Sequence, residues 1–130
     1  MNRKKCSYLA GLIDGEGTIG FSKCNGKYRV PVISIASTTF EFMDFLQNNF
    51  GGVVISKKVY SDKHSPSWEW RVTNQRALGI MLDVKEYMIE PKKVSRIEFL
   101  LNNYNPVRNG RYTDEEIKQK LQTEIDFFKI

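Results

Sequence analysis

The chain has 130 residues, of which 41% are hydrophobic and 12% aromatic, so it can form one folded domain over residues 1–130. Twenty basic residues against 15 acidic ones give a net charge of +5, which suits a polyanionic partner. Two isolated cysteines argue against a disulfide framework or a metal-binding cysteine motif, and no segment has the length and apolarity of a transmembrane helix.

The first half of the chain predicts a helix, a hairpin and a second helix. Residues 6–14 are expected to be helical, and the alternation over 18–23 predicts a strand. Asn25-Gly26 favours a tight turn into a returning strand over 28–36, in which Pro31 should lie near an edge or irregularity. Thr38 or Thr39 can cap a helix over 40–50, which Gly51-Gly52 would end.

The second half predicts another pair of strands followed by helices. Strands are expected over 53–60 and 68–73, followed by a helix over 75–83 that Asn74 can cap. Pro91 suits the first turn of a helix that continues to about residue 103. Thr113 and Glu116 predict a capping box for a last helix that ends near residue 128.

The predicted fold is α+β, with the order αββαββα followed by C-terminal helices. Its four strands should form one antiparallel sheet with helices on one face and an open, polar and basic second face. A β-ribbon of this kind fits the major groove of DNA. The residues expected to contact DNA from this face and its hairpin loops are Ser22, Cys24, Lys27, Tyr28, Arg29, Val30, Val32, Ser34, Ser56, Lys58, Tyr60, Glu69 and Arg71.

The segment 9–18 is the most informative in the chain. Its apolar part should be buried, and the small residues Ala10 and Gly11 allow another backbone to approach closely. Asp14 and Glu16 lie where the helix is expected to end, a place where the helix dipole disfavours carboxylates. A bound cation would compensate for this, and hard oxygen ligands suit Mg²⁺.

The string Leu-Ala-Gly-Leu-Ile-Asp-Gly-Glu-Gly at 9–17 resembles the signature of the LAGLIDADG homing endonucleases, and it occurs once. The resemblance implies a homodimer whose motif helices meet through Leu9, Ala10, Gly11 and Leu12. It also implies that Glu16 and the Gly15 carbonyl bind the catalytic metal, while Asp14 supports the helix ends. Cutting two DNA strands needs two acidic sites, and one chain holds one.

Two further residues match catalytic positions of the family. Lys93, near the start of the helix from Pro91, would stabilise charge at the scissile phosphate or order the attacking water. Ser37, at the end of the second strand, would hold the solvent network, although many members have Gln there.

The expected activity is metal-dependent hydrolysis of double-stranded DNA at a long, nearly palindromic site, as in intron or intein homing. Mg²⁺ is the expected ion, with Mn²⁺ as a substitute and Ca²⁺ as a non-activating ion. The alternative is a relative that kept the fold but lost cleavage, such as an RNA maturase or a DNA-binding protein. Neither reading involves a membrane or a small-molecule substrate, and both suit the inside of a mitochondrion, chloroplast or prokaryotic cell.

Overall fold

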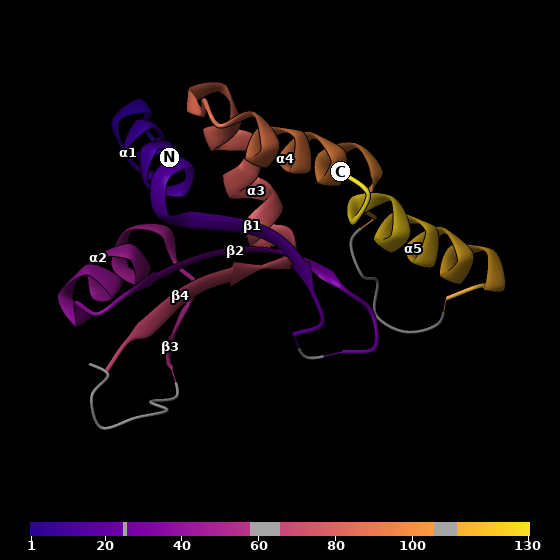
Figure 1. Cartoon of the computed structure of the whole chain (residues 1–130), viewed down its shortest axis with the longest axis horizontal. Coiled ribbons are helices and arrows are strands. Elements are labelled where there is room, and N and C mark those ends of the chain that lie inside the picture. The colour runs from indigo at the N-terminus through magenta and orange to yellow at the C-terminus, as the bar shows by residue number, and fades with distance from the viewer. Residues whose placement is uncertain (25, 58–65, 106–111) are drawn as a thin grey trace.

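The computed structural model describes residues 1–24, 26–57, 66–105 and 112–130. Figure 1 shows the arrangement of its helices and strands. In chain order these are α1 (Arg3–Glu16), β1 (Gly17–Ser22), β2 (Val30–Ser37), α2 (Phe40–Phe50), β3 (Val53–Ser56), β4 (Trp68–Thr73), α3 (Asn74–Val84), a 3₁₀ turn (Lys85–Tyr87), α4 (Pro91–Asn103) and α5 (Asp114–Phe127). The predicted αββαββα order with C-terminal helices is confirmed.

The four strands form one antiparallel sheet in the order β1-β2-β4-β3, which confirms the predicted fold class. Pro31 lies in the interior strand β2, where a missing backbone N–H would normally break a ladder. Its only strand partner is Phe21 of β1, because pairing with β4 begins at Val32. The irregularity expected at this proline is therefore the point where one of the two ladders starts.

One face of the sheet carries the core. Ile19, Ile33 and Trp70 point to this face and are fully buried. Figure 1 shows α1, α3 and α4 above the sheet, and α2 reaches the same core through Phe50, whose ring centroid lies 6.3 Å from that of Trp70. Within the described part of the chain no helix covers the opposite face, as the alternation of Trp68 to Thr73 predicted.

The junction between α1 and β1 depends on a glycine. Gly17 is buried, and a Cβ added to it would lie 2.7 Å from the Ile13 Cα. This distance is shorter than real Cβ contacts allow, so only glycine lets β1 leave the helix so closely. The backbone N–H of Gly17 also donates to the Ile13 and Leu12 carbonyls and ends the helix.

Several element ends differ from the predictions. Helix α1 runs over Arg3–Glu16 instead of 6–14, because Asn2 caps it and the acidic residues continue its last turn. Strand β2 begins at Val30 instead of residue 28. Asn74 is the first residue of α3, with a φ of 56°, and accepts a hydrogen bond from the Tyr104 hydroxyl at 3.1 Å instead of capping the helix.

Other predicted elements are confirmed at both ends. Helix α2 (Phe40–Phe50), strand β4 (Trp68–Thr73) and helix α4 (Pro91–Asn103) have the expected bounds. The capping box of Thr113 and Glu116 is present at the start of α5. Among the described residues, none of the helices has the length and apolar character that crossing a bilayer requires.

Candidate functional site

The last turn of α1 sends its two carboxylates in different directions. Side chains two residues apart on a helix do not share a face. Asp14 faces the entry of α4, where its carboxylate accepts hydrogen bonds from the backbone N–H groups of Ile89 at 3.0 Å and Glu90 at 3.1 Å. Glu16 is exposed, and among the described residues nothing forms a hydrogen bond or ion pair with its carboxylate. Of these two carboxylates, that of Glu16 is therefore the one that the described residues leave free to bind another group.

Lys93 lies beside this turn, although 79 residues separate it from Asp14 in sequence. Its ammonium donates to the Ile13 carbonyl at 2.9 Å and to the Asp14 carbonyl at 2.8 Å. A cation at a helix C-terminus is favourable with the helix dipole. Asp14 and Lys93 thus tie the end of α1 and the start of α4 to each other reciprocally.

Glu90 completes this junction and was missed by the sequence reasoning. It is the N-cap residue of α4, and its carboxylate accepts hydrogen bonds from the backbone N–H groups of Lys92 and Lys93. A signal was present, since an acidic residue directly before Pro91 is a reasonable N-cap. Its effect is to fix the turn that carries Lys93.

Ser37 lies at the end of β2 that is close to α1, two residues beyond Ile35, the partner of Gly17. Its hydroxyl oxygen accepts a hydrogen bond from the Thr39 N–H at 3.0 Å, which helps the chain turn into α2. Ser37 pairs with Trp68, so its side chain lies on the helix-covered face. The fold brings Ser37 to the same end of the sheet as Glu16.

The oxygen donors at the end of α1 fit part of a magnesium site. Gly15 and Glu16 are both exposed, and they offer one backbone carbonyl and one free carboxylate. Mg²⁺ keeps several waters and takes only one or two carboxylates, so such a pair is adequate when substrate oxygens add to it. No cluster of three or more His, Cys, Asp or Glu residues that would hold a metal occurs among the described residues of the chain.

The open face of the sheet is organised in rows that cross the strands. Thr18 pairs with Ser34, Ser34 with Arg71 and Arg71 with Val53, so one row spans all four strands. This face contains a hollow of about 170 Å³. Its lining includes six of the residues predicted to contact DNA, namely Ser22, Cys24, Val32, Ser34, Glu69 and Arg71, together with Thr18, Gly20 and Lys23.

Arg71 is the main cation within the sheet part of this hollow. Its guanidinium donates to the Glu69 carboxylate at 3.0 Å, and its side chain keeps 31% of its surface exposed. The pairing holds one nitrogen of the guanidinium and fixes the direction of the fork. The remaining N–H groups of this half-exposed side chain are available to an anionic or hydrogen-bonding ligand in the hollow.

The predicted face of β3 is corrected by the register. Ser56 pairs with Trp68 and Val54 with Trp70, so Ser56 lies on the helix-covered side. The open face of β3 instead carries Val53 and Ile55, which are 52% and 38% exposed. The three apolar residues Val53 to Ile55 show no alternation that would have revealed this. Lys58 and Tyr60 lie outside the described residues.

The hairpin loop between β1 and β2 divides its predicted contacts between two surfaces. Lys27 is exposed, as expected. Tyr28 and Arg29 turn toward α5: the Tyr28 ring packs against Tyr112, and the Arg29 guanidinium donates to the Phe21 carbonyl and lies beside Glu124. Arg29, which was expected to contact DNA, therefore packs against α5, whereas Tyr28 also lines a hollow with Lys27, Val30 and Thr73.

The predicted dimer seam on α1 is corrected in part. Leu9 and Ala10 are fully buried in the core of their own chain, so they cannot contact a second copy. Gly11 is exposed and Leu12 is half-buried. A Cβ added to Gly11 or to Gly15, four residues later, would meet no atom within 4 Å. The outward stripe of α1 thus contains glycines that the packing of a single chain does not require.

Comparison with known proteins identifies the fold. No family model matches the sequence, and no curated protein sequence is similar to it. Solved structures do match. An archaeal intron-encoded homing endonuclease, I-Vdi141I, complexed with DNA, is 16% identical with a TM-score of 0.63, and the alignment covers 97% of this chain and 83% of that one.

Two further solved structures have the same fold as this chain. The homing endonuclease I-CvuI in complex with its target in the presence of calcium is 14% identical with a TM-score of 0.54, covering 92% of this chain and 93% of that one. The LAGLIDADG homing endonuclease I-GzeII in complex with a DNA target is 17% identical with a TM-score of 0.62, covering 94% of this chain but only 43% of that one. The chain therefore has the fold of the LAGLIDADG homing endonucleases, as the motif at 9–17 predicted.

Proposed function

We propose that this chain is a site-specific endonuclease that cleaves double-stranded DNA as a homodimer with a divalent metal ion. The observation that carries this proposal is the exposed Glu16 carboxylate, which has no partner among the described residues and directly precedes β1 at one end of the open, polar sheet face. The solved structures with this fold are homing endonucleases, and several are DNA complexes. The net charge of +5 favours binding to a polyanion.

In this mechanism the chain's own groups bind and orient the phosphodiester. Glu16 and the Gly15 carbonyl would hold magnesium, which when bound supplies Lewis-acid stabilisation and activates water. The Lys93 ammonium has three N–H donors, of which two go to the Ile13 and Asp14 carbonyls. The third would donate to the scissile phosphate, and Ser37 would help to order the solvent around it.

The homodimer is proposed because one chain offers one Glu16, whereas two strands must be cut. The outward glycines Gly11 and Gly15 leave room for the α1 helix of a second copy to approach. The lengths of the similar structures support the same idea. This chain covers 83% and 93% of two solved endonucleases but 43% of a third, and that third chain is long enough for two such units. A dimer of this kind would present two open faces to a nearly palindromic target.

The test is cleavage of a plasmid library that carries randomised, nearly palindromic targets, in magnesium and in calcium. We expect cut ends in magnesium or manganese and none in calcium. Glu16→Gln should reduce cleavage of a selected target by at least about a hundredfold while leaving its binding intact. Glu98→Gln, which removes another exposed carboxylate, is the matched control and should cleave normally.

Two results would contradict the proposal. Cleavage by Glu16→Gln at the rate of the unmodified protein would remove Glu16 from the site. Specific DNA binding without cleavage under any metal condition would favour the alternative, a DNA-binding protein or RNA maturase that has kept only the fold.

A further inference from the structure

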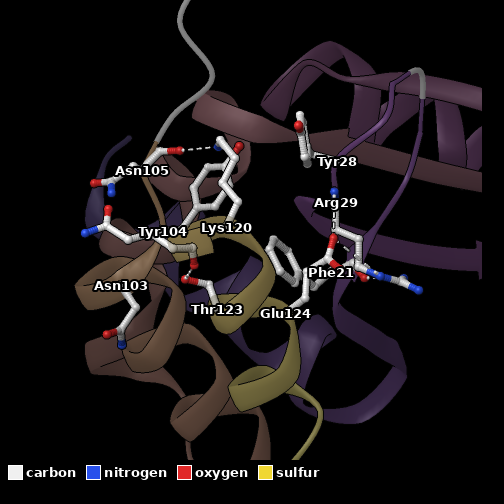
Figure 2. Close-up of a pocket in the computed structure, with 10 residues that line it drawn as sticks. Phe21, Tyr28, Arg29, Asn103, Tyr104, Asn105, Lys120, Thr123 and Glu124 are labelled. Carbon is white, nitrogen blue, oxygen red and sulfur yellow. Dashed lines mark hydrogen bonds and ion pairs between the residues drawn. The ribbon is translucent and has the colours of Figure 1, made fainter. Parts of the chain in front are cut away.

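The hairpin loop between β1 and β2 is held on one side by the C-terminal helix α5. The Glu124 carboxylate of α5 accepts a hydrogen bond from the backbone N–H of Arg29 at 3.3 Å, and it lies 3.9 Å from the Arg29 Nε. The Arg29 guanidinium also donates to the Phe21 carbonyl at 3.0 Å and lies 4.9 Å from the centroid of the Phe128 ring. Figure 2 shows Arg29, Phe21 and Glu124 together at this junction. The Arg29 guanidinium is thereby held by contacts within the chain, and 34% of its side chain remains exposed.

The neighbouring residue Tyr28 is held by a second set of contacts. Its ring meets that of Tyr112 edge to face, with centroids 5.5 Å apart. The Lys120 ammonium lies 4.8 Å from the Tyr112 centroid and 5.9 Å from that of Tyr28, and it donates to the Asn105 carbonyl at 3.3 Å. The cavity between α5 and the loop is only about 20 Å³, so these groups pack closely.

Helix α5 is itself fixed to the body of the protein. Phe127 is buried, and its ring lies 5.4 Å from that of Phe21 in β1 and 6.2 Å from that of Phe99 in α4. Figure 1 places α5 beyond α4, on the side of the sheet where the β1–β2 loop emerges. Contacts from α5 to Tyr28 and Arg29 therefore link the loop to a rigid element.

The first residues of the same loop, on the side away from α5, line the hollow of the open sheet face. Lys23 and Cys24 line that hollow, and the Lys23 and Lys27 side chains are exposed. The loop is thus attached to α5 through Tyr28 and Arg29 while its other described residues remain available to a ligand. Holding a loop in its bound shape lowers the entropy lost on binding and narrows the geometries in which its side chains can contact bases.

We infer that Glu124 is a positioning residue for target recognition: through Arg29 it sets the placement of Lys23, Cys24 and Lys27 on DNA. This inference rests on the proposed DNA endonuclease function.

The inference also predicts which base pairs of the target lose their preference when Glu124 is replaced. Strand β1 has 6 residues between Glu16 and the loop, and a strand rises about 3.3 Å per residue, so the loop lies about 20 Å from the proposed cleavage site. Base pairs stack about 3.4 Å apart, so the loop would read base pairs about six positions outward.

The test compares the unmodified protein with Glu124→Ala and Glu124→Gln in a binding selection from a randomised DNA library in calcium. Glu124→Ala should bind the selected target about tenfold more weakly and lose base preference at the outer positions, with preference near the centre unchanged. Glu124→Gln keeps an oxygen acceptor for the Arg29 N–H and should recover part of the outer preference. Glu115→Ala removes an exposed carboxylate from the same helix and should change nothing.

The outcomes separate the inference from the function on which it rests. An unchanged base preference at every position in both Glu124 variants would overturn the inference, and so would a uniform loss at all positions, which marks a purely structural role. If Glu124→Ala does not fold, Glu124→Gln alone decides between these results. A failure of the unmodified protein to select any DNA sequence would instead contradict the proposed function itself.

Discussion

Replacing Lys93 with methionine tests whether the junction of α1 and α4 is held as the structure indicates. The substitution keeps a long, flexible side chain but removes the ammonium that donates to the Ile13 and Asp14 carbonyls at 2.9 and 2.8 Å. Hydrogen bonds that involve a charged group contribute about 1.5–3 kcal/mol each when partly buried. The favourable interaction with the end of α1 adds about 0.3–1 kcal/mol.

Water recovers part of this loss, because Asp14 and Lys93 are only half-buried and the released carbonyls can be solvated. We therefore expect the free energy of unfolding to fall by about 1–3 kcal/mol in total. The entropy of unfolding is about 2.1 cal/mol/K per residue, or about 0.27 kcal/mol/K for a chain of this length. The melting temperature should consequently fall by about 4–11 °C.

The assay is thermal unfolding followed by circular dichroism, without DNA and with a chelator present, so that no ligand contributes to stability. Lys92→Met is the matched control, since it removes the same charge from the adjacent exposed position. Removal of a cation from the N-terminal turn of α4 should leave the stability of this control equal or slightly higher. Equal melting temperatures for the Lys93 and Lys92 variants would refute the reasoning.

Two further predictions concern the proposed dimer seam on α1 and Lys120 of α5. Gly11→Leu should leave the monomer folded, because the added Cβ meets no atom within 4 Å, but it should weaken self-association measured by sedimentation equilibrium; an unchanged dimer constant would exclude Gly11 from the seam. Burial beside the rings of Tyr104 and Tyr112 lowers the pKa of Lys120 from its ordinary 10.5, an effect that Glu116 partly opposes. The unfolded chain then holds this proton more tightly than the folded one, so stability rises as the pH passes the lowered pKa toward 10.5. The melting temperature of the unmodified protein should therefore increase relative to that of Lys120→Met over this range, and a difference that does not vary with pH would contradict the assignment.

The two acids of the motif show how far local reasoning reaches. Their chemistry and their spacing can be read from residues 14–16. The helix was expected to end at Asp14, yet it continues through Glu16, because Lys93 and the Gly17 N–H satisfy carbonyls of its last turn. As a consequence Asp14 points to α4 and Glu16 to solvent. The partner that decides this lies 79 residues away in the chain, so no local pattern could reveal it.

The faces of strand β3 and of the α1 seam are harder to predict from the sequence for a second reason. Val53 to Ile55 and Leu9 to Ile13 are apolar throughout, so their patterns do not distinguish the two sides of the element. Pairing with β4 places Val53 and Ile55 on the open face, and packing against the core buries Leu9 and Ala10. Where Trp68 to Thr73 alternate clearly, the assignment of faces from sequence is confirmed.

The sequence by itself determined the order of helices and strands, the antiparallel sheet with one open face, and the motif that identifies the fold. These follow from short-range properties: hydrophobic periodicity, capping residues, turn glycines and the nine-residue motif at 9–17. Tertiary structure alone decided which acid is free, which carbonyls Lys93 contacts, and that Arg29 is bound by Glu124 on α5 instead of facing the open sheet. These features join residues far apart in the chain, and only the packing of one element against another fixes which side of each one meets a partner.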